Sequence, residues 1–197
     1  MIYLASQCPR RRQLLEQLGV GYELLLPGND EDAEGMEAVL PGEAPLTYVK
    51  RVTHLKLQAA LKRRKARGLK PAPVLCSDTT VALGRQILGK PADTKDATRM
   101  LSELSGQTHR VLTAVSVGID KKQVQIVSIS KVRFATMTPA QIKAYVANGE
   151  PMGTAGAYAV QGRAAAFIEH ISGSYSGIMG LPVFETAQLL REFAYKF

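Results

Sequence analysis

The stretch IYLASQCPRRRQLLEQLGVGYELLL, residues 2–26, decides the fold class. Its first apolar run, residues 2–5, is short and predicts a buried strand. Pro9 favours the first turn of a helix over residues 9–18. A second strand is expected over residues 22–26. Because alternation of strands and helices is typical of α/β domains, this stretch predicts an α/β fold.

The rest of the chain continues this alternation. Apolar periodicity, capping residues and glycine or proline stops give the boundaries. Helices are expected over residues 46–67 and 94–103, from 138 to 149 and from 182 onward, and strands over 74–83, 110–119, 123–134 and 167–171. The two longest strands are expected to form a hairpin. We therefore expect one compact α/β domain with a cleft, spanning residues 1–197.

Length and composition are those of a globular protein. The chain has 197 residues, of which 46% are hydrophobic and 21% charged, so disorder of the whole chain is excluded. No apolar run approaches the roughly 20 residues that cross a bilayer, so no membrane partner is expected. The start of the chain lacks the cationic lead of a secretory signal, which favours a cytoplasmic location. Cys8 and Cys76 are too few for a disulfide scaffold.

Much of the positive charge lies in one segment. The formal net charge is +8, and six basic residues lie within residues 62–70. A single basic cluster at the end of a predicted helix is typical of a solvated face that complements the helix dipole. We therefore expect no nucleic-acid partner. A nucleic-acid-binding module that uses this cluster stays open as an alternative function.

Several common catalytic sites are excluded by residue spacing. The histidines, His54, His109 and His170, lack the paired spacing of a metal site. Ser128 and Lys131 match the S-x-x-K pattern of serine acyl enzymes, but they lie in a predicted strand and lack the companion motifs. The sequence contains neither a Walker A motif nor G-x-G-x-x-G. The chemistry must therefore come from other polar clusters.

A polar and basic cluster follows the first predicted strand. Ser6, Arg10 and Arg11 lie at the start of the helix over residues 9–18. Backbone N–H groups at a helix start carry partial positive charge, and guanidinium groups add forked donors, so phosphate oxygens suit this position. An exposed basic helix start without a ligand is the alternative.

A carboxylate interrupts an otherwise apolar strand. This residue is Asp78, and Thr79 follows it. A buried, unpaired carboxylate is costly, so a cation or a hydrogen-bond network is expected around it. The acidic loop over residues 27–43 offers Asp30 and Glu31 as oxygen ligands to a hard divalent cation beside Asp78. A turn aspartate and a solvated loop are the alternatives.

Two lysines and a glycine-rich passage complete the polar clusters. Lys90 follows the Asp78 segment closely enough to share its cleft, and Lys56 lies on the longest predicted helix. In residues 149–162, glycines allow close approach to a ligand, and the Gln161 amide can read the edge of a base. Together the clusters point to metal-assisted phosphate chemistry. The expected phosphate-binding residues are Ser6, Arg10, Arg11, Lys56 and Lys90.

These segments resemble the Maf proteins, a family of nucleoside triphosphate pyrophosphatases also called septum formation inhibitors. The resemblance covers nearly the whole chain, and the matches occur in the order seen in the family. The matching positions are Ser6, Pro9-Arg10-Arg11, Asp30-Glu31, Lys56, Asp78-Thr79, Lys90-Pro91, Leu104-Ser105-Gly106, His109, Gly149-Glu150-Pro151, Ala155-Gly156-Ala157-Tyr158, Gln161-Gly162, Gly173-Ser174-Tyr175 and Gly180-Leu181-Pro182.

The resemblance to Maf proteins implies both a fold and an activity. The fold would be an inosine triphosphatase-like α/β fold, with a mixed central sheet flanked by helices and a cleft between two lobes. The reaction would cleave a nucleoside triphosphate between its α- and β-phosphates with a divalent cation, magnesium, manganese or cobalt. Asp78 would be the proton acceptor. Members are often dimeric, so a homodimer is among the expectations.

The resemblance also implies a substrate class. Arg10, Thr79 and Gln161 fall where the family sets substrate choice. Asp78-Thr79 together with Gln161-Gly162 is similar to the branch that hydrolyses dTTP and UTP, rather than the branch that acts on 7-methyl-GTP. CTP and modified pyrimidine nucleotides stay open as further substrates.

The sequence departs from the family pattern at two positions. Cys8 stands where serine is usual, and a thiol is a weak donor to phosphate. Thr154 stands where lysine is common, so one positive charge is missing. We expect activity to survive these changes with altered affinity. A nucleotide-binding regulator of cell division without significant catalysis stays open as the alternative.

Overall fold

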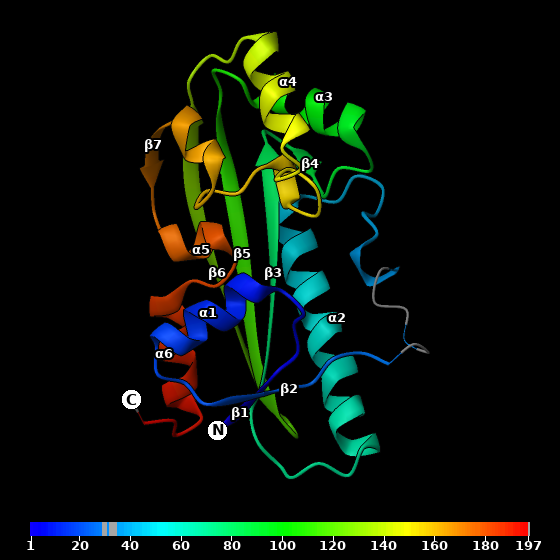
Figure 1. Ribbon diagram of the computed structural model, residues 1–197. Coiled ribbons are helices and arrows are strands. Elements are labelled where there is room, and N and C mark those ends of the chain that lie inside the picture. Colours follow the sequence, from blue (N-terminus) through cyan, green and yellow to red (C-terminus); the bar gives the residue numbers. More distant parts are fainter. Residues whose placement is uncertain (29–30, 32–34, 197) are drawn as a thin grey trace.

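The computed structural model describes residues 1–28, 31 and 35–196 of the chain. Its centre is a mixed sheet with the strand order β2-β1-β3-β5-β6-β7, in which β4 also pairs with β3 (Figure 1). The strands are β1 (Ile2–Leu4), β2 (Tyr22–Leu24), β3 (Val74–Leu83), β4 (Gln86–Leu88), β5 (Thr108–Ile119), β6 (Lys122–Phe134) and β7 (Ile168–Ser172). Strand β1 runs parallel to β2 and β3, and the remaining pairs are antiparallel. The predicted hairpin is confirmed, because β5 and β6 pair along their whole length.

Helices cover both faces and one end of this sheet. They are α1 (Pro9–Gln17), α2 (Pro45–Ala66), α3 (Thr94–Leu104), α4 (Pro139–Ala147), α5 (Tyr175–Met179) and α6 (Val183–Glu192), with 3-10 turns at Gly35–Glu37, Ala155–Ala157 and Arg163–Phe167. Figure 1 shows α2 on one side of the long strands and α1, α5 and α6 on the other, with α3 and α4 at the upper end. The predicted mixed α/β fold is confirmed.

The helix boundaries follow from the capping residues. Asp93 accepts a hydrogen bond from the Asp96 backbone N–H at 2.7 Å, which begins α3 as predicted. Thr138 forms a capping box with Gln141 at the start of α4. Gly19 ends the first helical segment with a φ of 68°, a left-handed conformation that favours glycine. These local signals explain why the predicted helices lie close to the observed ones.

The two faces of the sheet belong to separate parts of the core. Side chains alternate between the faces along a strand. On β3, Leu75 and Val81 belong to the apolar cluster that includes residues of α1, α5 and α6. Cys76 and Ala82 belong to the clusters formed with α2. Consecutive residues between Cys76 and Val81 therefore place their side chains on opposite faces of the sheet.

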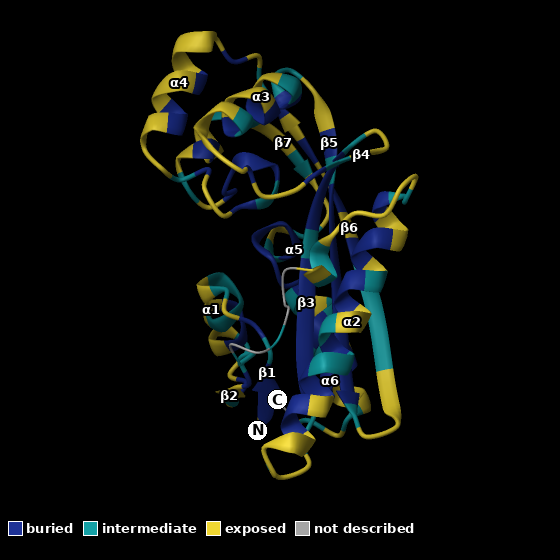
Figure 2. Cartoon of the chain, turned by 90° about the vertical axis from the view of Figure 1, so that its right-hand side faces the viewer, coloured by how far each residue is buried: buried dark blue, intermediate teal, exposed yellow. Residues whose placement is uncertain are grey.

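Strand β3 is uncovered along part of one edge. Its other edge pairs with β5 from Val74 to Ala82. On the open edge, β1 pairs with Val74 and Leu75 and β4 with residues 81–83, so within the described chain no strand pairs with residues 76–80. Figure 2 shows the part with β1, β2 and α1 below this gap and the part with β4, α3 and α4 above it. A cavity is lined by residues of both parts, among them Arg10 of α1 and Leu88 of β4, so the predicted arrangement of two lobes with a cleft is confirmed.

The basic segment over residues 62–70 is not a uniformly solvated face. Arg63 and Arg64 are buried, at 8% and 2% exposure. Arg64 donates to Asp120 at 2.6 Å and to the Ala72 carbonyl oxygen at 3.2 Å. The solvated-face prediction is therefore wrong for these two residues, because their guanidinium groups tie the end of α2 to neighbouring loops. Among the helices of the described residues, none has the length and apolar character required to span a bilayer.

Candidate active site

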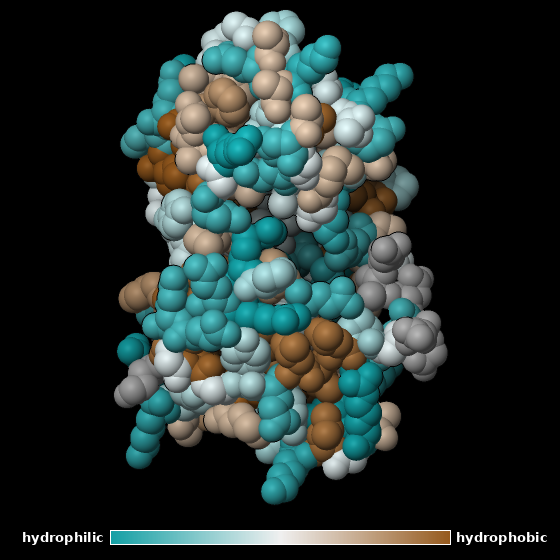
Figure 3. Space-filling model, in the orientation of Figure 1, coloured by the Kyte–Doolittle hydropathy of each residue, from teal (hydrophilic) through white to brown (hydrophobic). Residues whose placement is uncertain are grey.

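A cavity of about 540 Å³ lies at the open edge of β3. Figure 3 shows it as a hollow across the middle of the molecule, bordered largely by hydrophilic residues. This volume is typical of a site for a small molecule. The cavity brings together eight residues expected from the sequence, namely Ser6, Arg10, Arg11, Lys56, Asp78, Thr79, Lys90 and Gln161.

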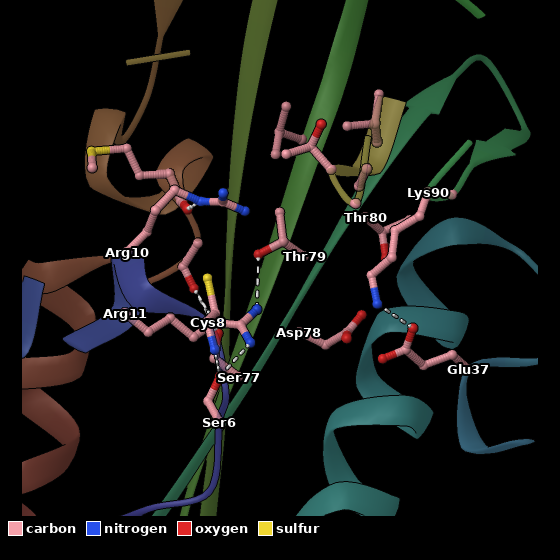
Figure 4. Close-up of a pocket in the computed structure, with 18 of the residues that line it drawn as sticks. Ser6, Cys8, Arg10, Arg11, Glu37, Ser77, Asp78, Thr79, Thr80 and Lys90 are labelled. Carbon is pink, nitrogen blue, oxygen red and sulfur yellow. Dashed lines mark hydrogen bonds and ion pairs between the residues drawn. The ribbon is translucent and has the colours of Figure 1, made fainter. Parts of the chain in front are cut away.

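The side of the cavity formed by α1 supplies guanidinium groups. Arg11 donates to the Gly180 carbonyl oxygen at 2.9 Å and to Ser6 Oγ at 3.1 Å. Arg10 Nε donates to the Met179 carbonyl oxygen at 3.2 Å. Figure 4 shows both guanidinium groups pointing into the cavity. The first turn of α1 therefore holds two fixed cations at the N-terminal end of the helix, an arrangement that suits phosphate oxygens.

Thr79 lies on the same side as these arginines. Its hydroxyl oxygen accepts from Arg11 Nη2 at 3.5 Å and lies 3.0 Å from the hydroxyl oxygen of Thr113. Thr113 also donates to the Gly177 carbonyl oxygen at 2.7 Å. The Thr79 hydroxyl is thus held by protein groups beside Arg11, and the residue lines the cavity, so its role in substrate choice stays a prediction.

Asp78 faces α2 and is paired with a lysine. It is 7% exposed, and Lys56 Nζ donates to its Oδ1 at 2.6 Å. The pairing meets the requirement that a buried carboxylate have a charged or hydrogen-bonding partner. Figure 4 shows the Asp78 carboxylate pointing into the cavity between Arg11 and Lys90. The carboxylate and the cationic groups therefore face one space.

The structure adds Glu37 to the side of the cavity where Lys56 and Asp78 lie. Lys56 Nζ lies 2.6 Å from Glu37 Oε1, and Lys90 Nζ lies 3.1 Å from Glu37 Oε2. Burial raises the pKa of the Glu37 carboxyl, but the charges and hydrogen bonds of Lys56 and Lys90 outweigh burial and lower it. No sequence signal separated Glu37 from the other acids of its loop, because the loop has no periodic pattern to orient its side chains.

Glu31 lies away from this group. Both of its carboxylate oxygens pair with Arg63, at 2.6 Å from Nε and 2.5 Å from Nη2. The hydrogen bond from Arg63 lowers the pKa of the Glu31 carboxyl. Asp30, the other expected ligand of the acidic loop, lies outside the described residues. A role for Glu31 at the metal therefore stays a prediction, and in this structure Arg63 occupies its oxygens.

The described residues contain no group of three or more histidine, cysteine, aspartate or glutamate side chains that could enclose a metal ion. A magnesium-like ion does not need such a cage, because it is usually bound through one or two carboxylates, substrate phosphates and water. Asp78 Oδ2 has no hydrogen-bond partner among the described residues, so it offers one hard oxygen ligand. The donor set therefore fits a cation that arrives with a nucleotide.

Gln161 reaches the cavity from a passage held by Glu150. The Glu150 carboxylate accepts from the backbone N–H groups of Arg163 and Ala164 at 2.9 and 3.3 Å and from the Tyr145 hydroxyl at 2.7 Å. A Cβ on Gly162 would lie 2.4 Å from this carboxylate, so a larger residue there would displace the Glu150 side chain from its hydrogen bonds. The Gln161 side chain is exposed and lines the cavity. Its amide is therefore free to meet a ligand.

An aromatic group forms another part of the lining, from two residues that the resemblance matched without giving them a role. Tyr158 lines the cavity, and its hydroxyl lies 2.8 Å from His109 Nε2. Tyr158 and His109 both pack edge-on against Phe134. Burial lowers the pKa of His109 to about 4. His109 is therefore neutral near pH 7 and acts as a hydrogen-bonding support for Tyr158.

The two departures from the Maf pattern both line the cavity. Burial raises the pKa of the Cys8 thiol, but Arg11 and Arg10 outweigh burial and lower it. Thr154 donates its hydroxyl to the Pro151 carbonyl oxygen at 2.7 Å. The Thr154 hydroxyl therefore stabilises its own turn, and Cys8 remains beside the expected phosphate position.

Comparison with known proteins gives the family. Residues 1–193 match the family model described as "Maf-like protein". A dTTP/UTP pyrophosphatase of Albidiferax ferrireducens is 70% identical, with 99% of this chain and 98% of the relative covered. Relatives of the same name from Polaromonas sp. and Ralstonia nicotianae are 68% and 62% identical, with 96% and 98% of this chain and 94% of each relative covered. The sequence-based identification is confirmed, and the chain belongs to the Maf-like protein family.

Proposed function

We propose that the protein hydrolyses dTTP and UTP to the nucleoside monophosphate and pyrophosphate. One observation carries this proposal: the Asp78 carboxylate faces the same cavity as Arg11 and Lys56. The names of the similar proteins, dTTP/UTP pyrophosphatase, support the choice of substrate. Polyphosphate recognition needs several cations in one space, and hydrolysis needs a group that accepts a proton from water.

In this account the triphosphate lies between two cationic walls. Arg10 and Arg11, supported by Ser6, bind phosphate oxygens from the α1 side. Lys56 and Lys90 bind from the opposite side, where both lysines reach the cavity. Guanidinium groups suit paired phosphate oxygens, and lysines act as point charges. Together they neutralise the charge that makes attack on the α-phosphate unfavourable.

Asp78 is the proton acceptor in this account. Its Oδ1 is fixed by Lys56, and its Oδ2, whose second lone pair would remain available beside a bound cation, takes the proton from the attacking water. Asp78 and the substrate phosphates would also hold a divalent cation, which supplies Lewis-acid polarisation of a phosphoryl oxygen when bound. The nucleobase of the substrate would lie toward Gln161, whose amide offers both a donor and an acceptor to the edge of uracil or thymine.

The finer expectations on assembly and location also belong to this proposal. The family resemblance supports a homodimer, and the cytoplasmic location is proposed alongside it. Sedimentation equilibrium would give the mass in solution, and fractionation of cells would give the compartment.

The test is a product analysis over a panel of nucleotides. The purified protein is incubated with magnesium and with dTTP, UTP, CTP, ATP or GTP, and the products are separated by anion-exchange chromatography. The proposal expects UMP or dTMP with equimolar pyrophosphate. Tight binding of dTTP without any pyrophosphate would instead favour the regulator, and release of single phosphates would reject the proposed bond cleavage.

A further inference from the structure

Glu37 connects the two lysines of the cavity. Its Oε1 accepts from Lys56 at 2.6 Å. Its Oε2 accepts from Lys90 at 3.1 Å (Figure 4). Lys56 comes from α2, whereas Lys90 comes from the loop that follows β4. One carboxylate therefore joins two cations that arise from separate elements on the same wall.

The segment that carries Glu37 is itself fixed to α2. The Tyr48 hydroxyl donates to the Glu37 carbonyl oxygen at 2.9 Å. Arg51 Nη2 donates to the Ala38 carbonyl oxygen at 2.8 Å, and its guanidinium group also binds the Glu43 carboxylate. Arg51 Nη1 also donates to the Met36 carbonyl oxygen at 3.5 Å. Because the backbone is held on both sides of Glu37, the position of its side chain at the edge of the cavity is fixed.

The two lysines depend on Glu37 to different extents. The Lys90 side chain is 59% exposed, and Glu37 is its one ion-pair partner among the described residues. The Lys56 side chain is 19% exposed and also pairs with Asp78. Without Glu37, Lys90 would be free to turn into solvent and Lys56 would rest on Asp78 alone. An ammonium group has three donors, so each lysine can keep its Glu37 contact while it binds a phosphate oxygen.

We propose that Glu37 is a positioning residue that places Lys56 and Lys90 for the phosphates of the substrate. The inference rests on the proposed function, because it supposes that these lysines bind a nucleoside triphosphate. Ordering two long, flexible side chains before binding reduces the entropy that the complex loses. An opposing effect exists, since a carboxylate near the phosphates repels them. The experiment is designed so that these effects give opposite signs.

The first measurement compares Glu37→Gln with the wild type. The amide keeps the size of the side chain but loses the charge that holds both ammonium groups. We expect KM for UTP to rise about five- to tenfold, which corresponds to roughly 1–1.4 kcal/mol of lost binding. The rise in KM should exceed any fall in kcat. An unchanged or lowered KM would overturn the inference, because it would show that the carboxylate is neutral or repels the substrate.

A matched variant controls for the change in charge. Glu169 forms one exposed ion pair with Arg133 at 2.8 Å and does not line the cavity. Glu169→Gln removes the same charge and should leave KM for UTP within about twofold of wild type. An equal rise in KM for both variants would contradict the inference, because it would report net charge rather than lysine placement.

A double-mutant cycle tests whether Glu37 acts through Lys90. In a Lys90→Met background, Glu37→Gln should raise KM clearly less than it does in the wild type, because one of its two targets is gone. Full additivity of the two changes would contradict the lysine-positioning account. Thermal unfolding of all variants shows whether they fold.

Direct binding separates this inference from the proposed function. The affinity for UTP is measured by calorimetry in the presence of EDTA, with Asp78→Asn and with the double variant Asp78→Asn, Glu37→Gln. Weaker UTP binding by the double variant supports the inference even if the wild type releases no pyrophosphate. Equal UTP binding by both overturns it even if the wild type is an active pyrophosphatase.

Discussion

Lys56 of α2 and Asp78 of β3 form an ion pair, with Lys56 Nζ 2.6 Å from Asp78 Oδ1. The pair joins helix α2 to the stretch of β3 that pairs with β5 on one edge and, within the described chain, with no strand on the other. Both side chains are mostly buried, at 19% and 10% exposure. A buried carboxylate is thereby kept beside the cavity with a cation that can also meet a phosphate.

Loss of Lys56 should weaken both substrate binding and the fold. Lys56→Met leaves Asp78 without its cation, so we expect a loss of about 1–3 kcal/mol in the free energy of unfolding. We also expect KM for UTP to rise about tenfold or more, because a phosphate ligand is lost. Urea unfolding and steady-state kinetics measure the two effects. Lys62→Met, on an exposed position of the same helix, should change neither quantity appreciably.

Arginine at position 11 should not be replaceable by lysine. Arg11 donates to Gly180, Ser6 and Thr79 through three nitrogen atoms. A lysine has one nitrogen and cannot keep this geometry. Arg11→Lys should therefore raise KM for dTTP and UTP by about tenfold. Arg12→Lys is the neighbouring control, since Arg12 does not line the cavity. Equal kinetics for the Arg11 variant and the wild type would contradict this assignment.

His109 should make stability depend on pH between about 4 and 6.5. Burial lowers its pKa from 6.5 to about 4, so in this range the unfolded chain binds a proton that the folded protein does not. The contribution of His109 to the free energy of unfolding is therefore fully present above about pH 6.5. It is lost as the pH drops, by roughly 3 kcal/mol over the whole range. Urea unfolding at pH 7 and pH 5 measures the difference. The difference should shrink in His109→Gln, and an unchanged difference would point to other groups.

A magnesium titration tests whether Glu31 takes part in binding the divalent cation. EDTA should abolish pyrophosphate release, and magnesium should restore it. In the structure Arg63 holds both Glu31 oxygens. Glu31→Gln should lower the melting temperature, because the ion pair with Arg63 is weakened, and as the predicted metal ligand it should raise the magnesium concentration for half-maximal rate by more than about tenfold. A concentration within about threefold of the wild-type value would contradict the metal role and leave Glu31 as the ion-pair partner of Arg63.

The parts of the fold that sequence predicts well are those with a repeating pattern or a capping residue. The apolar run around Asp78 predicts β3, and Asp93 predicts the start of α3. The segments at Ala155–Ala157 and Arg163–Phe167 have no such period, because 3-10 turns depend on local hydrogen bonds and on the Glu150 carboxylate. Their position beside the cavity therefore depends on tertiary contacts, which the sequence pattern does not show.

The candidate site likewise combines residues that the sequence indicates with residues that only the structure reveals. Arg11 stands out at the start of a predicted helix and Asp78 as a carboxylate inside an apolar strand, and the structure brings both to one cavity with Lys56. The acidic loop contains several carboxylates, and the sequence does not indicate which of them reaches the cavity. Which of them meets Lys56 and which meets Arg63 is decided by how the loop folds over α2, so Glu37 is visible only in three dimensions.

The most direct test of the account is pyrophosphate release from UTP and dTTP by the wild type and by Asp78→Asn. Asparagine keeps the shape of the side chain but cannot accept the proton from water. The account predicts equimolar monophosphate and pyrophosphate from the wild type and a loss of about 100-fold or more in kcat for the variant. UTP binding by the variant should be retained. Turnover by Asp78→Asn at the wild-type rate would contradict the central claim.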